Sequence, residues 1–295
     1  MKALFIGNLT LDIFENNLRV GGPGFYGGRA LSEGFNVEVY ALTNVDRYYR
    51  GLILGIANIY GIKILELENK GMPMFRISSG KATEFSGTSH KIPNHIIESS
   101  IKIIGFDIVT LAPIMNEVSI DAVTIIKSNS QSLLSADIQG FVRSMIDNKI
   151  ICIWSKDLGE KLMLFDIIHG NVAEYCFTND ERIVLKNIAD LSSTCETLFL
   201  ASLDQRGTYA IHRGEIIYVP SVPVKPVEDV GAGDILLAVT SYYRAIGNPV
   251  IEAVVKGVIA ASLKVENAYK MRWFDLEHIE TIYNEHVRKI KGINL

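Results

Sequence analysis

A short stretch of small and acidic residues gives this chain its strongest chemical signal. The sequence Glu-Asp-Val-Gly-Ala-Gly-Asp occupies residues 228–234, and the apolar run that follows predicts a buried helix. At a helix N-terminus, backbone N–H groups lack partners and the helix dipole is positive, which together favour an anion. We therefore expect the amides of Gly231, Ala232 and Gly233 to bind a negatively charged group. The carboxylate of Asp234 would accept a proton from an attacking hydroxyl group.

A lone Gly-x-Gly-Asp could equally be an ordinary turn before a helix, but the whole run is more specific. It resembles the second signature of the ribokinase-like (PfkB) carbohydrate kinases, usually Asp-Thr-x-Gly-Ala-Gly-Asp. The resemblance implies that Asp234 is the catalytic base and that the Gly-Ala-Gly amides form an anion hole. This chain has Glu228 where the family has Asp, and Asp229 where it has Thr. The added charge could repel a nucleotide phosphate or help to hold Mg²⁺, so the preferred nucleotide stays open.

Composition excludes several classes of function. The chain has 295 residues, of which 48% are hydrophobic, and a formal net charge of −4. This charge gives no general attraction to nucleic acid or anionic lipid, so we expect neither as a partner. The longest apolar region, residues 249–265, contains Glu252 and Lys256, which favours a buried helix over a membrane span.

The cysteines suggest a reducing compartment. Cys152, Cys176 and Cys195 show neither a CxxC motif nor the Cys/His spacing of a zinc site, and two of them lie in apolar, strand-like runs. We expect buried free thiols. Polar residues interrupt the apolar N-terminus early, so it does not predict a signal peptide. These features favour a cytoplasmic protein.

Strand-like and helix-like segments alternate along the chain, which predicts an α/β fold with a mainly parallel sheet between two layers of helices. The expected strands are residues 3–6, 36–42, 107–111, 132–137, 150–154, 174–177 and 197–201. The expected helices are residues 47–60, 119–128, 179–191, 234–245, 249–265 and 275–291, with Asp275 as the N-cap of the last.

Two more polar segments, about residues 13–20 and 72–91, interrupt this alternation. Flanking Gly, Ser and Pro residues indicate exposed strands. The resemblance implies that they form a small, discontinuous β lid over the carboxyl edge of a three-layer α/β/α ribokinase-like sheet. We expect a single domain over residues 1–295.

Asp12 and a glycine-rich turn are the expected acceptor site. Asp12 follows the first strand, at the sheet edge where α/β proteins bind ligands. A solvated loop carboxylate is the alternative, but the resemblance implies binding of substrate hydroxyl groups. In the glycine-rich stretch 21–28, Gly22 matches the family's first signature. Tyr26 stands where that signature usually has Asn, which indicates an acceptor unlike ribose. A merely flexible loop is the alternative.

The same stretch contains a literal Gly-x-Gly-x-x-Gly at Gly22, Gly24 and Gly27. A dinucleotide-binding fingerprint must follow the first strand directly and open the first helix. A second strand-like segment and Pro23 intervene here. We therefore reject a nicotinamide oxidoreductase.

A polar group after the strand at 132–137 bears on the acceptor. Asp137 is followed by Gln139 and Arg143, whose amide and guanidinium groups suit a polyol. The arrangement resembles the myo-inositol kinases of plants and archaea. A structural Asp–Arg pair is the alternative.

The donor site is expected further along the chain. Asn179 and Glu181 resemble the family's Asn-x-x-Glu, whose Glu organises water around Mg²⁺, but Glu181 stands one residue early. Ser202 and Gly207 resemble the Thr-x-Gly-x-x-Gly that lines the nucleotide phosphates, although Asp204 replaces its middle Gly. The resemblance implies ATP and Mg²⁺ along this loop and the amides of Gly231 and Gly233.

These expectations define an ATP-dependent kinase of a small polyol, with myo-inositol as the favoured acceptor. A sugar or sugar-acid kinase and a nucleoside kinase are alternatives, since residues 72–77 could form an apolar slot for a base. A non-catalytic ligand-binding protein is a further alternative, although retention of Asp234 argues against it. A monomer and a homodimer are both compatible with the sequence.

Overall fold

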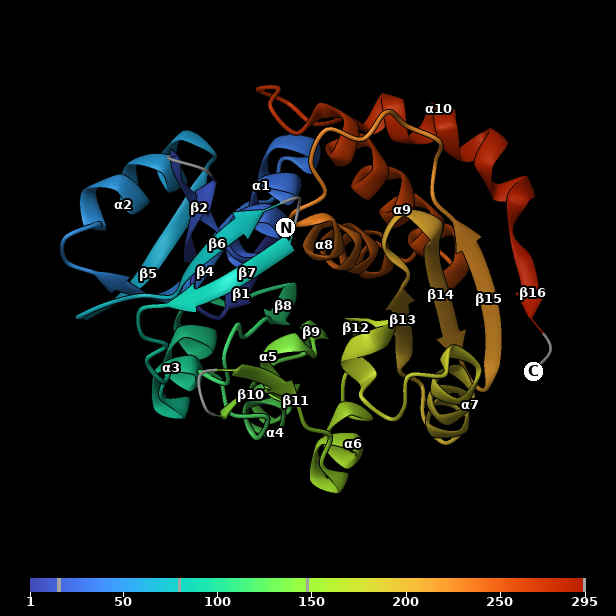
Figure 1. The fold of residues 1–295 in the computed structure, drawn as a ribbon, viewed down its shortest axis with the longest axis horizontal. Helices are drawn as coiled ribbons and strands as arrows, with labels where there is room; N and C mark the ends of the chain where they lie inside the picture. The colour runs from blue at the N-terminus through green and yellow to red at the C-terminus, as the bar shows by residue number, and fades with distance from the viewer. Residues whose placement is uncertain (15–16, 79–80, 147–148, 294–295) are drawn as a thin grey trace.

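The fold is built around one large, mainly parallel sheet (Figure 1). The computed structural model describes residues 1–14, 17–78, 81–146 and 149–293. In sheet order, the strands are β16 (Lys291–Ile293), β15 (Glu215–Pro220), β14 (Gly207–His212), β13 (Leu198–Ser202), β12 (Ile167–Asn171), β9 (Leu133–Asp137), β8 (Ile108–Leu111), β1 (Lys2–Ile6), β4 (Glu38–Asp46) and β5 (Ile62–Asn69). From β5 to β13 neighbouring strands are parallel, and β14, β15 and β16 add antiparallel pairs.

Helices cover both faces of this sheet because the strand side chains are apolar on both sides. One face packs against α1 (Pro23–Phe35), α2 (Arg50–Ile59), α8 (Ala232–Ala245), α9 (Val250–Asn267) and α10 (Leu276–His286). The other packs against α3 (Asn94–Ile104), α4 (Ala122–Asn129), α6 (Lys156–Leu162) and α7 (Glu181–Ser192). The expected three-layer α/β/α fold is confirmed. Within the described ranges, every helix falls short of what a membrane crossing requires.

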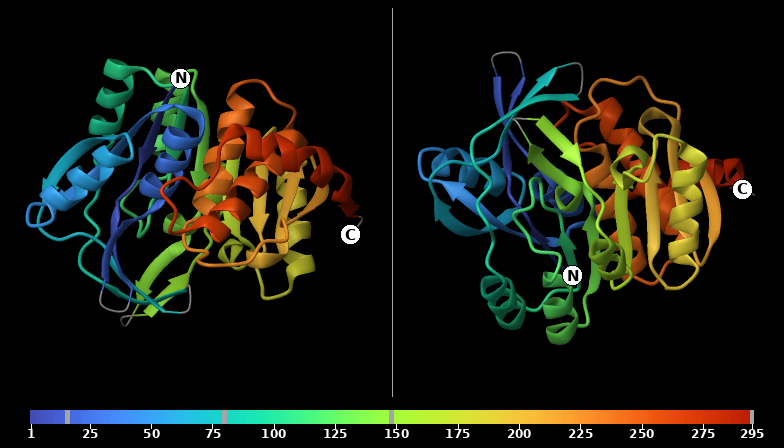
Figure 2. Two further views of the ribbon diagram at one scale, coloured as in Figure 1. Left: turned by 90° about the horizontal axis from the view of Figure 1, so that it is seen from above. Right: turned by 60° about the horizontal axis from the view of Figure 1, so that its bottom comes forward.

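A second, four-stranded sheet has the order β3-β2-β6-β7. Its strands are β2 (Thr10–Phe14), β3 (Asn17–Gly21), β6 (Met74–Ser78) and β7 (Lys81–Ser86). Both views of Figure 2 show it projecting on the same side of the main sheet as the hairpin of β10 (Arg143–Ile146) and β11 (Lys149–Cys152). This sheet overlaps the lid segments expected at 13–20 and 72–91, and we refer to it below as the lid. Residues 15–16 and 79–80 of those segments lie outside the described residues.

Three sequence expectations about secondary structure are wrong. Residues 150–154 overlap β11 of the hairpin and do not enter the main sheet, and residues 174–177 are not a strand. The chain there forms the 3₁₀ helix η1 (Val172–Tyr175), because β12 ends earlier and Asn171 caps the following turn. The last helix ends at His286, and the 3₁₀ helix η3 (Val287–Lys289) then leads into β16. Asp275 is its N-cap, as expected, accepting from the His278 N–H at 3.0 Å.

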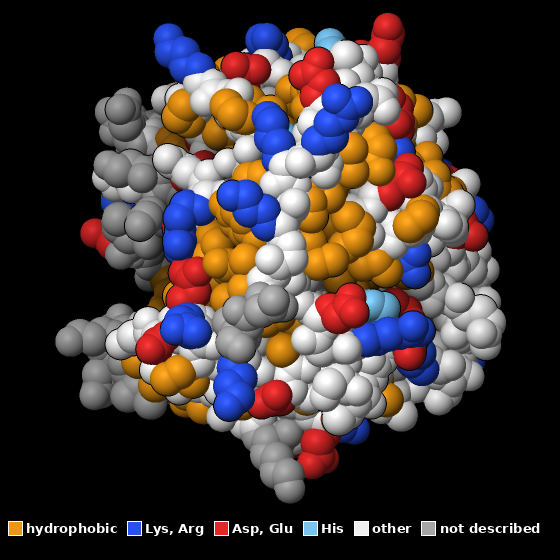
Figure 3. Space-filling model, turned by 90° about the vertical axis from the view of Figure 1, so that its right-hand side faces the viewer, with side chains coloured by type: hydrophobic (Ala, Val, Ile, Leu, Met, Phe, Trp, Pro, Cys, Tyr) orange, Lys and Arg blue, Asp and Glu red, His pale blue; other side chains and the backbone are white. Residues whose placement is uncertain are grey.

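The face of the molecule beyond the β16 edge carries hydrophobic side chains near its middle (Figure 3). Lys and Arg side chains on this face are interspersed with Asp and Glu. This mixture of charges, like the net charge of −4, provides no extended positive surface here for a polyanion.

Candidate active site

The anion-hole loop, residues 228–233, leads into α8. Gly231 is the N-cap of this helix, and its φ of 81° lies in the left-handed region that favours glycine. The Ala232 N–H donates to the Asp229 carbonyl at 3.0 Å. Among the described residues, the N–H groups of Gly231, Gly233 and Asp234 have no hydrogen-bond partner. These three amides, rather than that of Ala232, are therefore available to an anion.

Asp234 lies in the first turn of α8, beside these amides. Burial raises the pKa of its carboxyl group to about 8, and the charge of Asp137 adds to this shift. The nearby charges of His169 and Lys264 act in the opposite direction. An Asp with such a pKa can take up a proton near neutral pH, as a general base must.

One cavity of about 820 Å³ joins the anion-hole loop to the lid. It contains Asp234 and Gly233 on one side and Asp12, from β2, on the other. Asp12 is 3% exposed, and the Thr10 hydroxyl group donates to it at 2.8 Å. Burial raises the pKa of Asp12 to about 6. Free backbone amides, a candidate base and a second carboxylate thus line one cavity.

Lid residues close the acceptor end of this cavity. Phe14, Phe75 and Ile77 from the lid line it, together with Ile114 from the main domain. Gly22 lines it as well, as the N-cap of α1 with a φ of 89°. Because α1 follows β3 of the lid and not β1, the context of a dinucleotide-binding fingerprint is absent.

Tyr26 lies at the acceptor side but is 6% exposed, and its ring packs beneath the anion-hole loop. A Cβ atom on Gly231 would come within 2.3 Å of this ring. The ring is also stacked on Trp273, with 6.3 Å between centroids. From the sequence, Tyr26 is expected only to contact the substrate through its hydroxyl group. In the structure, the Tyr26 ring also packs against Gly231 and supports the turn there.

The group after β9 also faces the cavity, which Asp137, Gln139 and Arg143 all line. Asp137 accepts from the Gln139 N–H at 2.9 Å and lies 2.7 Å from Nδ1 of His169. His169 comes from β12, and its Nε2 is buried without a hydrogen-bond partner among the described residues. Sequence reasoning does not single out His169, because it belongs to no familiar motif.

The structure separates two candidate Asn and Glu sets. Asn179 and Glu181, at the start of α7, are outside the residues that line the cavity. Glu181 instead accepts from Arg206 at 3.0 Å and from the Tyr209 hydroxyl group at 2.9 Å. Glu181 thus lies outside the lining of the cavity that contains Asp234, and its assignment as a metal residue stays a prediction.

Asn171 and Glu174 have the spacing Asn-x-x-Glu, and both line the cavity. They close a capping box at the start of η1, in which the Glu174 carboxylate accepts from the Asn171 N–H at 2.9 Å. Arg143 donates to the same carboxylate at 3.2 Å. The sequence signal for this pair was present and was overlooked because residues 174–177 were interpreted as a strand.

The expected donor loop also reaches the cavity. Ser202 ends β13, and Gly207 begins β14 with a φ of 124°. Asp204 has a φ of 51°, the left-handed conformation that favours the Gly it replaces. Its carboxylate accepts from Asn171 at 2.8 Å. The substitution therefore keeps a glycine-like turn while adding a negative charge.

Glu228 is balanced by two cations. Arg19 of the lid donates to its carboxylate at 2.7 Å, and Nζ of Lys264 lies 3.7 Å from it. The negative charge of Glu228, which the usual Asp would also carry, is thus compensated within the protein. The ion pair with Arg19 also joins the lid to the anion-hole loop.

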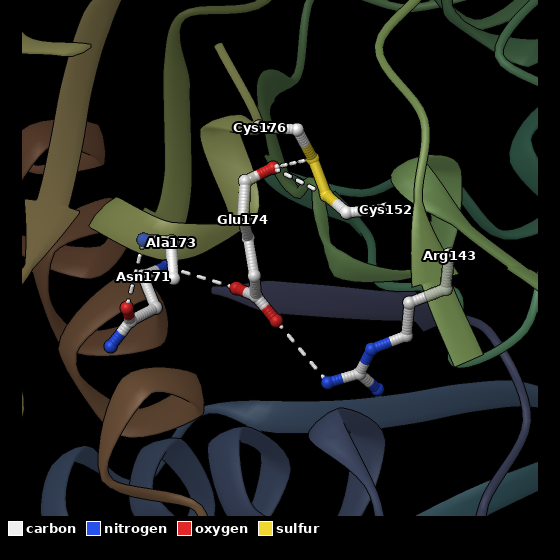
Figure 4. The surroundings of a disulfide bond; sticks show 6 residues. All are labelled: Arg143, Cys152, Asn171, Ala173, Glu174 and Cys176. Atoms are coloured by element: carbon white, nitrogen blue, oxygen red, sulfur yellow. Dashed lines mark hydrogen bonds and ion pairs between the residues drawn. A yellow bond between two sulfur atoms is a disulfide. The ribbon is translucent and has the colours of Figure 1, made fainter. Parts of the chain in front are cut away.

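Two cysteines are not free thiols, contrary to expectation. Cys152 and Cys176 form a disulfide that joins β11 to the end of η1 (Figure 4). Both sulfur atoms lie near the Glu174 carbonyl oxygen, at 3.4 Å and 3.0 Å. Cys195 is the free cysteine of the described chain. Spacing along the sequence could not reveal that the hairpin folds back onto η1.

The acidic groups in the cavity fit a magnesium ion only in combination with a phosphate. The described residues contain no cluster of three or more His, Cys, Asp or Glu side chains that could hold a metal alone. Mg²⁺ is usually bound by one or two carboxylates with water and substrate phosphates. Glu174 and Asp204, which both line the cavity, provide that number of carboxylates.

Comparison with known proteins agrees with this geometry. The profile of the pfkB family carbohydrate kinases matches residues 122–271. A search of curated proteins found no match. Among solved structures, a pyrophosphate-dependent kinase in the ribokinase family, complexed with a pyrophosphate analogue and myo-inositol, superposes with a TM-score of 0.77 at 18% identity, covering 95% of this chain and 99% of that one.

Two further kinase structures are also similar. Ribokinase from Thermotoga maritima has a TM-score of 0.70 at 15% identity, with 96% of this chain and 99% of that chain covered. Phosphofructokinase-2 from Escherichia coli in complex with potassium has a TM-score of 0.68 at 16% identity, with 97% and 98% covered. At these identities the likeness establishes the fold.

Proposed function

Because the chain belongs to the pfkB family of carbohydrate kinases, we propose that it transfers the terminal phosphoryl group of ATP to a hydroxyl group of a small polyol. The observation that carries this proposal is the cavity that contains both the Asp234 end of α8 and Asp12 of the lid strand β2. A donor phosphate at the free amides and an acceptor at Asp12 would meet beside Asp234.

The residues divide the reaction between them. Asp12, with Gln139 and Arg143, hydrogen-bonds the acceptor hydroxyl groups and fixes its orientation. Asp234 takes the proton from the attacking hydroxyl group, and that oxygen forms a bond to the terminal phosphorus as the bond to the leaving phosphate breaks. The N–H groups of Gly231 and Gly233 stabilise charge on the transferring group. The apolar lid residues exclude water, which would otherwise accept the phosphoryl group.

We assign the donor phosphates to the loop of Ser202 and Gly207, next to the anion-hole loop. Mg²⁺, when bound with the donor, would neutralise charge on its phosphates. Glu174 and Asp204 are the residues that would hold it. Arg143, paired with Glu174 at 3.2 Å, keeps that carboxylate in place.

ATP is favoured over smaller donors by the apolar wall beyond these loops. Val222, Val224, Val258, Ala261 and Val265 line the cavity there, as a base and ribose would require. Pyrophosphate is the second candidate, because one similar structure is of a pyrophosphate-dependent kinase. The carboxylates of Asp204 and Asp229 at this edge are a second argument for pyrophosphate, because they would repel the longer polyphosphate chain of ATP more strongly.

For the acceptor we favour myo-inositol. The similar structure with myo-inositol bound supports this choice, as does the polar set of Asp12, Gln139 and Arg143. Sugars and sugar acids are the alternatives with the same chemistry. A nucleoside would use the apolar side chains of Phe14, Phe75 and Ile77 instead.

A matrix of donors and acceptors tests the proposal. ATP, GTP and pyrophosphate are each combined with myo-inositol, ribose, fructose 6-phosphate, a sugar acid and adenosine, and the phosphorylated product is measured by mass spectrometry. We expect product from ATP and myo-inositol. The Asp234→Asn variant should bind both substrates but turn over roughly 10²–10⁴-fold more slowly. Absence of product from every pair would refute a kinase, and product from another acceptor alone would refute the choice of myo-inositol.

A further inference from the structure

Lys264 is a buried cation that lies directly against the anion-hole loop. It comes from α9, and its side chain is 1% exposed. Its Nζ donates to the Glu228 carbonyl oxygen at 3.2 Å and, more closely, to the Val230 carbonyl oxygen. The Tyr26 ring centroid lies 5.3 Å from the same nitrogen. A buried ammonium group requires such partners, and all of them here belong to the loop or to the ring that supports it.

The contact with Val230 determines where the next amide points. Peptide bonds in the described chain are trans, so the C=O of Val230 and the N–H of Gly231 point in opposite directions across one rigid plane. Binding the oxygen on the α9 side therefore directs the N–H of Gly231 away from α9. That N–H has no other partner among the described residues, and Gly231 lines the cavity.

The surroundings explain why a cation is needed at this place. Carboxylates of Glu228, Asp229 and Asp234 all act on Lys264 through their charge. Lys264 offsets one of these negative charges, which would otherwise repel a phosphate at the loop. Arg19 binds Oε2 of Glu228 at 2.7 Å, whereas Nζ of Lys264 lies 3.7 Å from Oε1 of the same carboxylate.

We propose that Lys264 is a built-in monovalent cation, which holds the anion-hole loop in its phosphate-binding form and makes phosphoryl transfer independent of an added monovalent cation. The inference rests on the proposed function, and it makes Lys264 a positioning residue that acts through the Gly231 amide. Backbone carbonyl oxygens of this kind also bind potassium in other proteins, so a free ion can take the place of the ammonium group once it is removed.

The test compares the wild-type chain with two variants of Lys264 and one control variant. The wild-type protein is assayed in sodium, potassium, ammonium and tetramethylammonium salts at equal ionic strength. Lys264→Met keeps most of the side-chain volume but removes the charge, and Lys264→Ala opens space for an ion. Lys256→Met is the matched control. Lys256 lies two turns earlier on α9 and its side chain is 5% exposed, but it pairs with Glu252 and Glu280, each at 2.7 Å.

We expect wild-type turnover to be the same in all four salts. Lys264→Met should lose roughly 10²–10³-fold in turnover, as enzymes do when an oxyanion-hole donor is misplaced. Lys264→Ala should recover at least about tenfold of its loss in potassium or ammonium but not in tetramethylammonium, which a merely structural role would not produce. The control variant should keep its turnover and show no response to the salts.

Three kinetic results would overturn the inference: wild-type turnover that depends strongly on potassium, Lys264→Met turnover close to that of the wild type, or no salt rescue of Lys264→Ala. The first of these results is measured on the wild-type protein, so it can be obtained even if the variants do not fold. Calorimetric binding of inorganic pyrophosphate separates this inference from the proposed function. If the wild type binds pyrophosphate but phosphorylates no acceptor, the kinase proposal fails. Weaker binding by Lys264→Met would still support the role of Lys264, whereas equal binding would refute it.

Discussion

His169 and Asp137 form a buried pair directly behind the anion-hole loop, with 2.7 Å between Nδ1 and Oδ2. A Cβ atom on Gly233 would come within 2.6 Å of the His169 ring, so the ring supports the turn from below. Burial lowers the pKa of His169, but the hydrogen bond and the charge of Asp137 raise it more, and the folded-state pKa lies above 6.5.

The His169→Gln variant should therefore lose stability in a pH-dependent manner. A histidine with a raised pKa stabilises the fold fully below pH 6.5, and the contribution disappears as pH rises through the folded-state pKa. Breaking a buried pair costs about 3 kcal/mol. Urea unfolding at pH 6 and pH 9 should show the larger loss at pH 6. His286→Gln is the control, because burial lowers the pKa of His286 and predicts the opposite trend. An equal loss at both pH values would contradict a charged His169.

Catalysis should show its own pH dependence, from Asp234 and Lys264. Burial raises the pKa of Asp234 to about 8, with Asp137 and Glu174 adding to it, and burial lowers that of Lys264 to about 8. The base must lose its proton while the ammonium group keeps its own, so kcat/KM should rise towards pH 8 and fall above it. The two apparent values belong to the interacting pair. In the Lys264→Met variant, the fall of kcat/KM above pH 8 should be absent from the residual activity. If the fall is unchanged in this variant, it belongs to another titrating group.

The two Asn and Glu sets can be distinguished by a pair of variants. Glu174 faces the cavity and is bound to Arg143, whereas Glu181 is bound to Arg206 on the surface. We expect Glu174→Gln to lower turnover roughly 10²-fold and to shift its magnesium dependence, because a phosphate-side carboxylate is removed. Glu181→Gln should leave turnover and its magnesium dependence unchanged. It removes an exposed ion pair, which contributes only about 0–1 kcal/mol to stability, so the fold should also be kept. Initial rates over a magnesium series measure turnover and its magnesium dependence, and the reverse ranking would favour Glu181.

The contrast between these two sets shows what the sequence could and could not predict. The fold and the Gly231–Asp234 loop were predictable because local signals, namely strand–helix alternation and small residues before an apolar helix, coincide with their structure. Glu174 was misassigned because apolar residues around it suggested a strand, while the Asn171 cap makes the chain turn.

Contacts between distant segments lay beyond sequence reasoning. Lys264 appears in the sequence as one residue of a helix that is expected to be buried, and only packing of α9 against α8 brings it to the Val230 carbonyl oxygen. Asp137 and His169 meet because β9 and β12 are neighbours in the sheet, although 32 positions separate them in the sequence. Such pairings depend on strand order and helix packing, which periodicity alone does not specify.

The disulfide between Cys152 and Cys176 should stabilise the fold and hold η1 in place. It closes a loop with a sequence separation of 24, which corresponds to about 3 kcal/mol in a chain-entropy treatment. Cys152→Ser, or treatment with a reducing agent, should lower the melting temperature by several degrees. Since the Glu174 carbonyl oxygen lies against both sulfur atoms, the open form should also bind the donor more weakly, as a raised KM at a nearly constant kcat. Cys195→Ser, which alters the free cysteine, should change neither quantity. If the wild type melts at the same temperature with and without reductant, the disulfide contributes nothing to stability, and the expectation of free thiols would be reinstated.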